Sequence, residues 1–285
     1  MKISALILRI YHTAIDAAPS NPTYRSNRAA ALMSAGQYAA ALEDCKVADE
    51  LNPDDPKILH RLARIYTFLG RPGEALDVYT RIQPSATATD KAPALMMQQH
   101  IQQAEAALKD GTSGSMVIHA LDQAEKGLGN LVETPRKWKL LRGEGYLKMG
   151  NVNSLGDAQT VAMSLLRSNS NDPEALVLRG RILYAQGEND KAVQHFRQAL
   201  SCDPDFKDAV KWLRMVQKLD RMKEEGNNYF KSSRFQQAVD TYTQALEVDP
   251  ANKGTNSKIL QNRALCYIKV EYHISLSVFP NANAA

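Results

Sequence analysis

Residues 173–206 read PEALVLRGRILYAQGENDKAVQHFRQALSCDPDF, and this stretch decides the fold. Apolar residues between Leu176 and Tyr184 recur at three- and four-residue spacing, which predicts an amphipathic helix. Gly187 is typical of the turn that ends a helix, and a second helical pattern then runs up to Pro204. A single pair of helices cannot bury both of its faces, so the stretch predicts further copies of itself on either side.

Copies of the pattern are present along the chain. The stretches 22–55, 56–89 and 219–252 carry small, aromatic and proline residues at the same offsets, and 136–172 is a looser copy. A helix–turn–helix unit with a period of about 34 residues resembles the tetratricopeptide repeat. The sequence therefore predicts an all-α fold, a tetratricopeptide-repeat solenoid in which antiparallel helix pairs form a right-handed superhelix.

Two positions of each unit are expected to set the distance between its helices. Gly180 would let the two helices of its unit approach closely, and Phe196 would fill the gap between them. Gly226 and Tyr242 occupy the same positions in the stretch 219–252.

The pattern predicts three groups of repeats and a tail. Residues 1–89 hold the N-terminal repeats, of which the first is incomplete, and residues 90–206 hold the middle repeats, of which the first is degenerate. Residues 207–270 hold the C-terminal repeats, of which the last is incomplete. We expect residues 271–285 to be irregular, because Pro280 would lie inside the second helix of a further unit, where proline costs about 3 kcal/mol or more.

The composition argues against several classes of function. The net charge of +4 is modest and no run of Lys and Arg is present, so we expect no nucleic-acid partner. No stretch is long and apolar enough for a transmembrane helix, and the apolar run at 3–8 is too short for a signal peptide. We therefore expect no membrane contact and a location in the cytoplasm or the nucleus.

The sequence also lacks the short motifs of enzymes. Nucleophile elbows, phosphate-binding glycine loops and zinc-protease motifs are absent, and the histidines are scattered singly, so we predict a non-catalytic protein without cofactor or metal. Cys45, Cys202 and Cys266 lie far apart without a CxxC pair. They are predicted to be small buried residues in a reducing compartment.

Polar residues on the first helices of the units predict a binding surface, because these helices line the concave face of a repeat solenoid. The middle units carry Leu141 and Leu178 at the sixth position, so polar sets lie on either side of an apolar region. The predicted peptide-carboxylate-binding residues are Asn27, Lys57 and Arg61 in the N-terminal group, and Lys223, Asn227 and Asn262 in the C-terminal group.

The spacing within these sets suggests a role. Lys57 and Arg61 are four residues apart and share one helical face. Asn27 and Arg61 hold the sixth position of consecutive units, so we expect them to be neighbours across the groove. Lys and Arg offer charge-assisted donors and Asn amides fix orientation, which suits a carboxylate at the end of an extended peptide. The alternative is that all six are solvated helix residues or cap formers.

Two pairs of segments resemble the dicarboxylate clamps of chaperone-binding tetratricopeptide proteins: RSNRAA (25–30) with PKILHRLA (56–63), and KEEGNNYF (223–230) with SKILQNRALCY (257–267). The order of the groups is similar to that of the cytosolic tetratricopeptide J-protein (DnaJ-type) co-chaperones. The resemblance implies an adaptor that binds the acidic C-termini of heat-shock chaperones of the seventy- and ninety-kilodalton classes.

The chain departs from that family in two respects. It contains no HPD tripeptide, so we expect no J domain and no stimulation of a chaperone ATPase. Each clamp is half present, so we expect a form of a longer co-chaperone that is truncated at both ends. Three alternatives remain open: a repeat scaffold that binds another protein, an endoplasmic-reticulum repeat co-chaperone that binds unfolded substrate, and the regulatory part of an enzyme.

Overall fold

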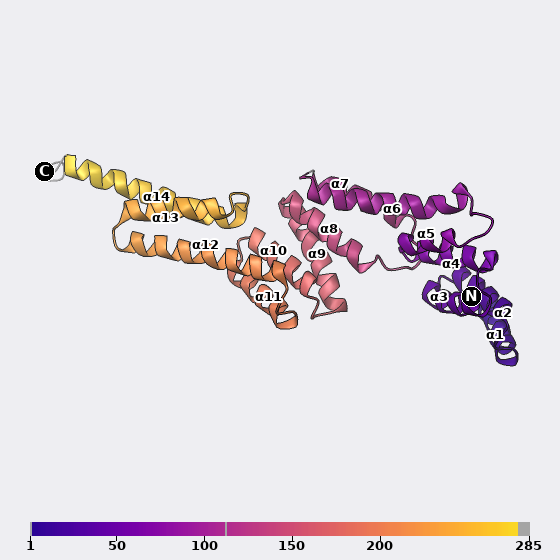
Figure 1. Ribbon diagram of the computed structural model, residues 1–285. Coiled ribbons are helices and arrows are strands. Elements are labelled where there is room, and N and C mark those ends of the chain that lie inside the picture. The colour runs from indigo at the N-terminus through magenta and orange to yellow at the C-terminus, as the bar shows by residue number, and fades with distance from the viewer. Residues whose placement is uncertain (1, 112, 279–285) are drawn as a thin grey trace. The chain divides into compact units, whose positions relative to one another are not determined.

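The computed structural model describes residues 2–111 and 113–278, and over these residues the chain is helical without strands (Figure 1). The predicted all-α fold is confirmed. The first helices in chain order are α1 (Lys2–Ala17), α2 (Pro22–Ser34), α3 (Tyr38–Leu51), α4 (Pro56–Phe68), α5 (Pro72–Thr80), α6 (Ala88–Lys109) and α7 (Gly114–Glu125). They are followed by α8 (Arg136–Met149), α9 (Val152–Ser168), α10 (Pro173–Ala185), α11 (Asn189–Cys202), α12 (Lys207–Lys231), α13 (Phe235–Val248) and α14 (Lys253–Val278).

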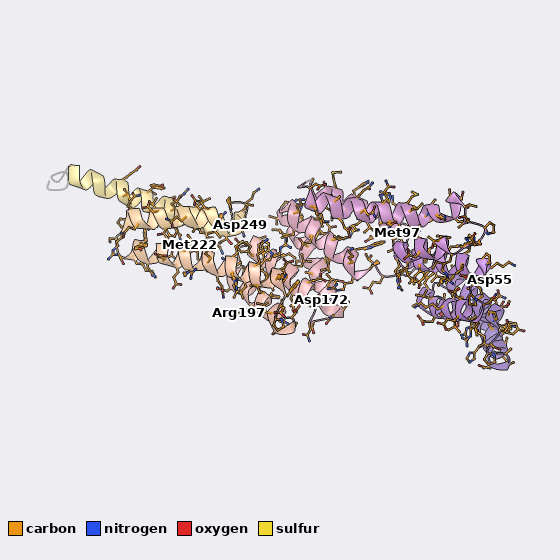
Figure 2. All side chains as sticks on the ribbon, in the orientation of Figure 1. Asp55, Met97, Asp172, Arg197, Met222 and Asp249 are labelled. Carbon is orange, nitrogen blue, oxygen red and sulfur yellow. The ribbon has the colours of Figure 1, made fainter. Side chains whose placement is uncertain are left out.

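The first helix of a unit begins with the same chemistry in three places. A cap residue precedes a proline, which has no N–H to leave unpaired at the first helical position. The side-chain oxygens of Asn21, Asp55 and Asp172 accept from backbone N–H groups two or three residues further on, in α2, α4 and α10. Asp55 and Asp172 are labelled in Figure 2. The cap residue and the proline that follows it therefore recur with the repeat, as the apolar pattern does.

The turn inside each unit is also repeated. Gly36, Gly70 and Gly187 follow α2, α4 and α10 with φ of +75°, +72° and +78°, in the left-handed region that glycine adopts without a steric penalty. The next helix then starts two residues later and runs back along the first. The antiparallel helix pairs expected from the sequence follow from these turns.

The contacts divide the chain into two compact units, Met1–Gly145 and Tyr146–Ala285. The division into three groups of repeats follows the sequence pattern and stays a prediction. The degenerate repeat joins the first unit, where the segment after α7 folds back so that Gly129 N donates to Phe68 O at 2.9 Å. Lys137 of α8 also pairs with Glu105 of α6 at 2.5 Å.

The second unit contains a contact between helices that are not neighbours in the repeat order. The start of α14 lies against the turn between α10 and α11, where Asn252 Nδ2 donates to Tyr184 O at 3.0 Å and Lys258 Nζ donates to Gly187 O at 2.9 Å. Gly254 lies so close to this turn that a Cβ there would collide with the carbonyl oxygen of Ala185. Helix α14 thus contacts α10 as well as α12.

The tail differs from the prediction in its first part. Helix α14 continues to Val278, so residues 271–278 are helical rather than irregular. No proline or glycine interrupts the pattern before Pro280, which explains why the helix continues. The remainder of the predicted tail, 279–285, lies outside the described residues.

The close approach of paired helices takes the predicted form. In α10 and α11, Gly180 faces Phe196, and a Cβ on Gly180 would lie 2.5 Å from Phe196 Cε1. In α12 and α13, a Cβ on Gly226 would lie 2.6 Å from Tyr242 Cε1. Both aromatic side chains are almost wholly buried, so a ring from the second helix occupies the volume that the glycine leaves free.

The same substitution is predicted to have opposite effects at two glycines of the second unit. Gly180→Ala should destabilise the fold by about 1–3 kcal/mol, because the new methyl group overpacks against Phe196. Gly156→Ala, in α9 where nothing lies within 4 Å of the new Cβ, should stabilise by about 0.4–1 kcal/mol. Denaturant unfolding of both variants measures the difference, and stabilisation by Gly180→Ala would contradict the tight packing.

Candidate functional site

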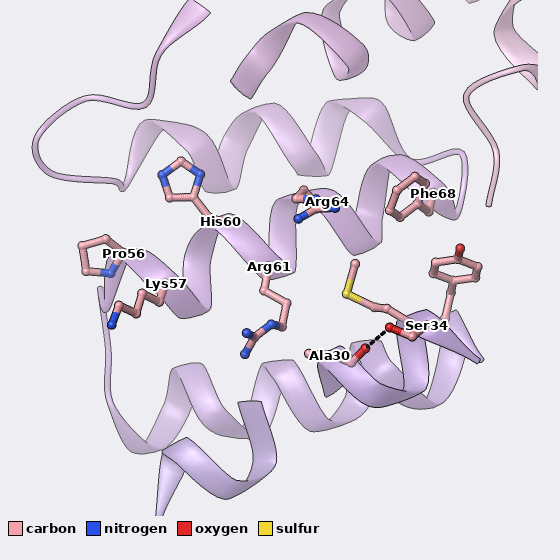
Figure 3. Close-up of a pocket in the computed structure, with 10 residues that line it drawn as sticks. Ala30, Ser34, Pro56, Lys57, His60, Arg61, Arg64 and Phe68 are labelled. Carbon is pink, nitrogen blue, oxygen red and sulfur yellow. Dashed lines mark hydrogen bonds between the residues drawn. The ribbon is translucent and has the colours of Figure 1, made fainter. Parts of the chain in front are cut away.

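The two predicted cations of the first unit line one cleft. Lys57 and Arg61 project from α4, and the cleft between α4 and α2 has a volume of about 650 Å³ (Figure 3). Its lining residues are Ala30, Met33, Ser34, Tyr38, Pro56, Lys57, His60, Arg61, Arg64 and Phe68. Sequence reasoning thus found two of the residues that form this cleft.

Arg61 reaches across to the preceding unit, as its position predicts. Its Nη1 donates to Ser26 O at 2.5 Å and also to Ser26 Oγ. The partner is therefore Ser26 and not the neighbouring Asn27, which is not among the residues that line the cleft. The structure brings Lys57 and Arg61 together and leaves Asn27 beside them on α2.

The cleft carries positive charge that no acidic lining residue neutralises. Helices α2 and α4 contain no Asp or Glu, and none of the lining residues is acidic. The nearest carboxylate in sequence, that of Asp55, accepts from the N–H groups of Lys57 and Ile58 as the helix cap. Within the described part of the chain, the Lys57 ammonium group has no carboxylate partner. The cleft therefore offers positive charge to a ligand.

One end of the cleft is aromatic. The rings of Tyr38 and Phe68 lie 5.2 Å apart with a tilt of 49°, and Met33 lies beside them in the lining. The sequence analysis missed this wall. A helical face continued from Lys57 and Arg61 at three- and four-residue steps would have found Phe68, but Tyr38 is the first residue of a different helix, α3.

Two of the predicted residues of the second unit are hydrogen-bonded to each other. Asn262 Nδ2 donates to Asn227 Oδ1 at 3.0 Å, and Tyr242 OH donates to the same oxygen at 2.6 Å. These three side chains line a cavity of about 160 Å³ together with Phe230, Lys231 and Leu265. Both asparagines were predicted as site residues, but neither their contact nor the tyrosine that holds it was predicted from the sequence.

Lys223 is placed differently. Its Nζ lies 3.3 Å from Asp220 Oδ1, and Lys223 is not among the residues that line the cavity at Asn227. Asp220 in turn accepts from Asn189 Nδ2 at 2.7 Å. The cation of this set is thus paired inside the protein, unlike Lys57.

The other chemistry of the described residues is limited. They contain no group of His, Cys, Asp or Glu arranged to hold a metal ion, and none of the described helices is long and apolar enough to cross a membrane. Cys45 and Cys266 are buried as predicted, whereas Cys202 is exposed near the end of α11, where the expectation of burial was wrong. Burial raises the pKa of the Cys45 thiol to about 12 and raises that of Cys266.

This difference predicts the thiol reactivity of the native protein. Because the thiolate is the reactive form, iodoacetamide at neutral pH should modify Cys202 and leave Cys45 and Cys266 unmodified. In denaturant all three thiols should react. Intact-mass measurement before and after denaturation counts the adducts, and rapid native labelling of Cys45 would contradict the packing around α3.

Comparison with known proteins supports the repeat assignment. Tetratricopeptide-repeat family models match residues 32–98, 173–206 and 225–252. The tetratricopeptide domain of P58(IPK) matches with a TM-score of 0.51 over 96% of this chain and 79% of its own, at 21% identity, which shows the fold alone. The chain therefore carries tetratricopeptide repeats, and its fold is the predicted solenoid of helix pairs.

Two curated proteins show which tetratricopeptide-repeat proteins this chain is similar to in sequence. The DnaJ homolog subfamily C member 7 homolog of Schizosaccharomyces pombe is 32% identical over 266 residues, 93% of this chain and 49% of the relative. DnaJ homolog subfamily C member 7 of Homo sapiens is 32% identical over 260 residues, 89% of this chain and 51% of the relative. The chain is therefore homologous to DnaJ homolog subfamily C member 7 over most of its length, and it spans about half the length of these relatives.

Proposed function

We propose that this protein is a co-chaperone module that binds the acidic C-termini of heat-shock chaperones of the seventy- and ninety-kilodalton classes, in the cytoplasm or the nucleus. The observation that carries the proposal is the cleft on α4, where Lys57 and Arg61 present positive charge and no lining residue is acidic. Homology to a DnaJ-type protein supports a chaperone as the partner.

The N-terminal set would hold the end of the peptide by charge. A C-terminal peptide that ends in an acidic residue carries two carboxylates close together, one on the side chain and one on the main chain. Lys57 supplies a mobile ammonium group, and Arg61 supplies the guanidinium N–H groups that are not bonded to Ser26. Asn27 would contribute its amide from the opposite helix.

The C-terminal set would hold a carboxylate through oriented amides. Because Asn227 Oδ1 accepts from both Tyr242 and Asn262, its amide orientation is fixed and its NH₂ group remains as a donor for a ligand. Lys223 would have to leave Asp220 to join it. We therefore assign the stronger site to the first unit and a weaker one to the second.

The proposal predicts how binding responds to loss of one cation. Arg61→Ala should weaken binding of an acidic peptide about tenfold or more, since a hydrogen bond to a charged group contributes roughly 1.5–3 kcal/mol and each 1.4 kcal/mol is about tenfold. Lys223→Ala should have a smaller effect, because that lysine is already paired with Asp220. Titration calorimetry with a peptide that ends in Asp measures both.

The control variant is Lys46→Ala, which removes an exposed lysine that pairs with Glu43 on α3, outside the cleft. It should leave the affinity unchanged. Amidation of the peptide C-terminus should weaken binding, and added salt should weaken it further because the cleft is open to counter-ions. If amidation and Arg61→Ala both leave the affinity unchanged, the protein is a scaffold for a different kind of peptide.

A further inference from the structure

Arg64 is a third cation of the cleft on α4 that the proposed function does not use. It lines the same cleft as Lys57 and Arg61 (Figure 3). Its side chain is exposed, and no carboxylate of the described residues pairs with it. The opposite wall, formed by Ala30, Met33 and Ser34 of α2, offers no acidic partner either.

The spacing places the three cations in a row. Arg64 follows Arg61 by three residues and Lys57 by seven, so all three lie on one face of α4. At 1.5 Å per residue, the seven residues cover about 10 Å along the helix axis. An extended peptide rises about 3.3 Å per residue, so the same length corresponds to about three peptide residues.

No acidic residue among those that line the cleft neutralises the positive charges of Lys57, Arg61 and Arg64. Like charges three or four residues apart on one helix repel each other and lower its stability. Two exposed arginines elsewhere in the first unit are paired: Arg71 with Glu74, and Arg81 with Asp49 and Asp54. The row on α4 differs from these pairs, and an anionic ligand of matching length would remove the repulsion.

We propose that Arg64 determines specificity by binding an acidic side chain about three residues upstream of the C-terminus of the peptide. The ligand class is then an extended C-terminal segment with at least three carboxylates: the terminal one, that of the last side chain and one further upstream. This inference rests on the proposed function and specifies which acidic peptides the site prefers.

The alternative is that Arg64 only keeps the cleft surface soluble. In that case its removal would change the affinity for every acidic peptide by the same small factor, through the general loss of one charge. A specific contact would instead couple Arg64 to one peptide position. The two possibilities are separated by a double-mutant cycle across the interface.

The experiment uses the full chain with Lys223→Ala, so that the C-terminal set contributes little. Peptides end in a free carboxylate on Asp and carry Glu at each of the three preceding positions, and each Glu is replaced by Gln in turn. Each peptide is titrated into the Lys223→Ala protein and into the same protein with Arg64→Gln, Arg64→Lys or the control Lys46→Gln. Circular dichroism and thermal unfolding check that every variant is folded.

We expect Arg64→Gln and one Glu→Gln replacement each to weaken binding about two- to fivefold, with no further loss when they are combined, as for an exposed charge pair. Arg64→Lys should retain part of the coupling, and Lys46→Gln should show none. Independent effects at all three positions would overturn the role of Arg64, while the proposed function would stand on the effect of Arg61→Ala. If no acidic peptide binds, both fail.

Discussion

The packing of paired helices in the second unit depends on the contact between a glycine on the first helix of a pair and an aromatic ring on the second. In the second unit this contact occurs as Gly180 with Phe196 and as Gly226 with Tyr242. Each ring is buried in the space that the missing Cβ leaves, so the two helices pack closely. The sides that face each other are therefore buried in this contact. The first helices are then free to present their other face to a ligand.

The repeat period explains how residues far apart in sequence meet. Arg61 reaches Ser26 and Asn262 reaches Asn227, and both pairs are 35 residues apart. Tyr242 takes part in the core and in the site at once, because its ring packs against Gly226 while its hydroxyl group holds the amide of Asn227. The orientation of that amide is therefore set by the same residue that fixes the distance between α12 and α13.

The repeat pattern made the fold and part of the site predictable. The repeat period, the turn glycines and the small–large pairs are visible in the sequence, and they predicted the helix pairs, the Gly180 contact and the common face of Lys57 and Arg61. The contact of the segment around Gly129 with Phe68 leaves no local signal in the sequence, so this contact was not predicted. The repeat pattern also does not predict which side chains bond to each other. Arg61 bonds to Ser26 rather than to Asn27, and Lys223 pairs with Asp220.

The contact of α14 with the turn between α10 and α11 changes how the second unit can come apart. In a simple solenoid each repeat touches only its neighbours, so an end helix can fray while the rest stays folded. Here Asn252, Lys258 and Gly254 attach the last helix to a turn two pairs back, and Thr255 Oγ1 donates to Asn189 Oδ1 at 2.9 Å within the same junction. Contacts thus form a closed circuit through α10, α12 and α14. Detaching α14 would open the hydrogen bond between Asn262 and Asn227 and would also expose the buried polar groups of this junction. The last helix is therefore held more firmly than the end helix of a simple solenoid.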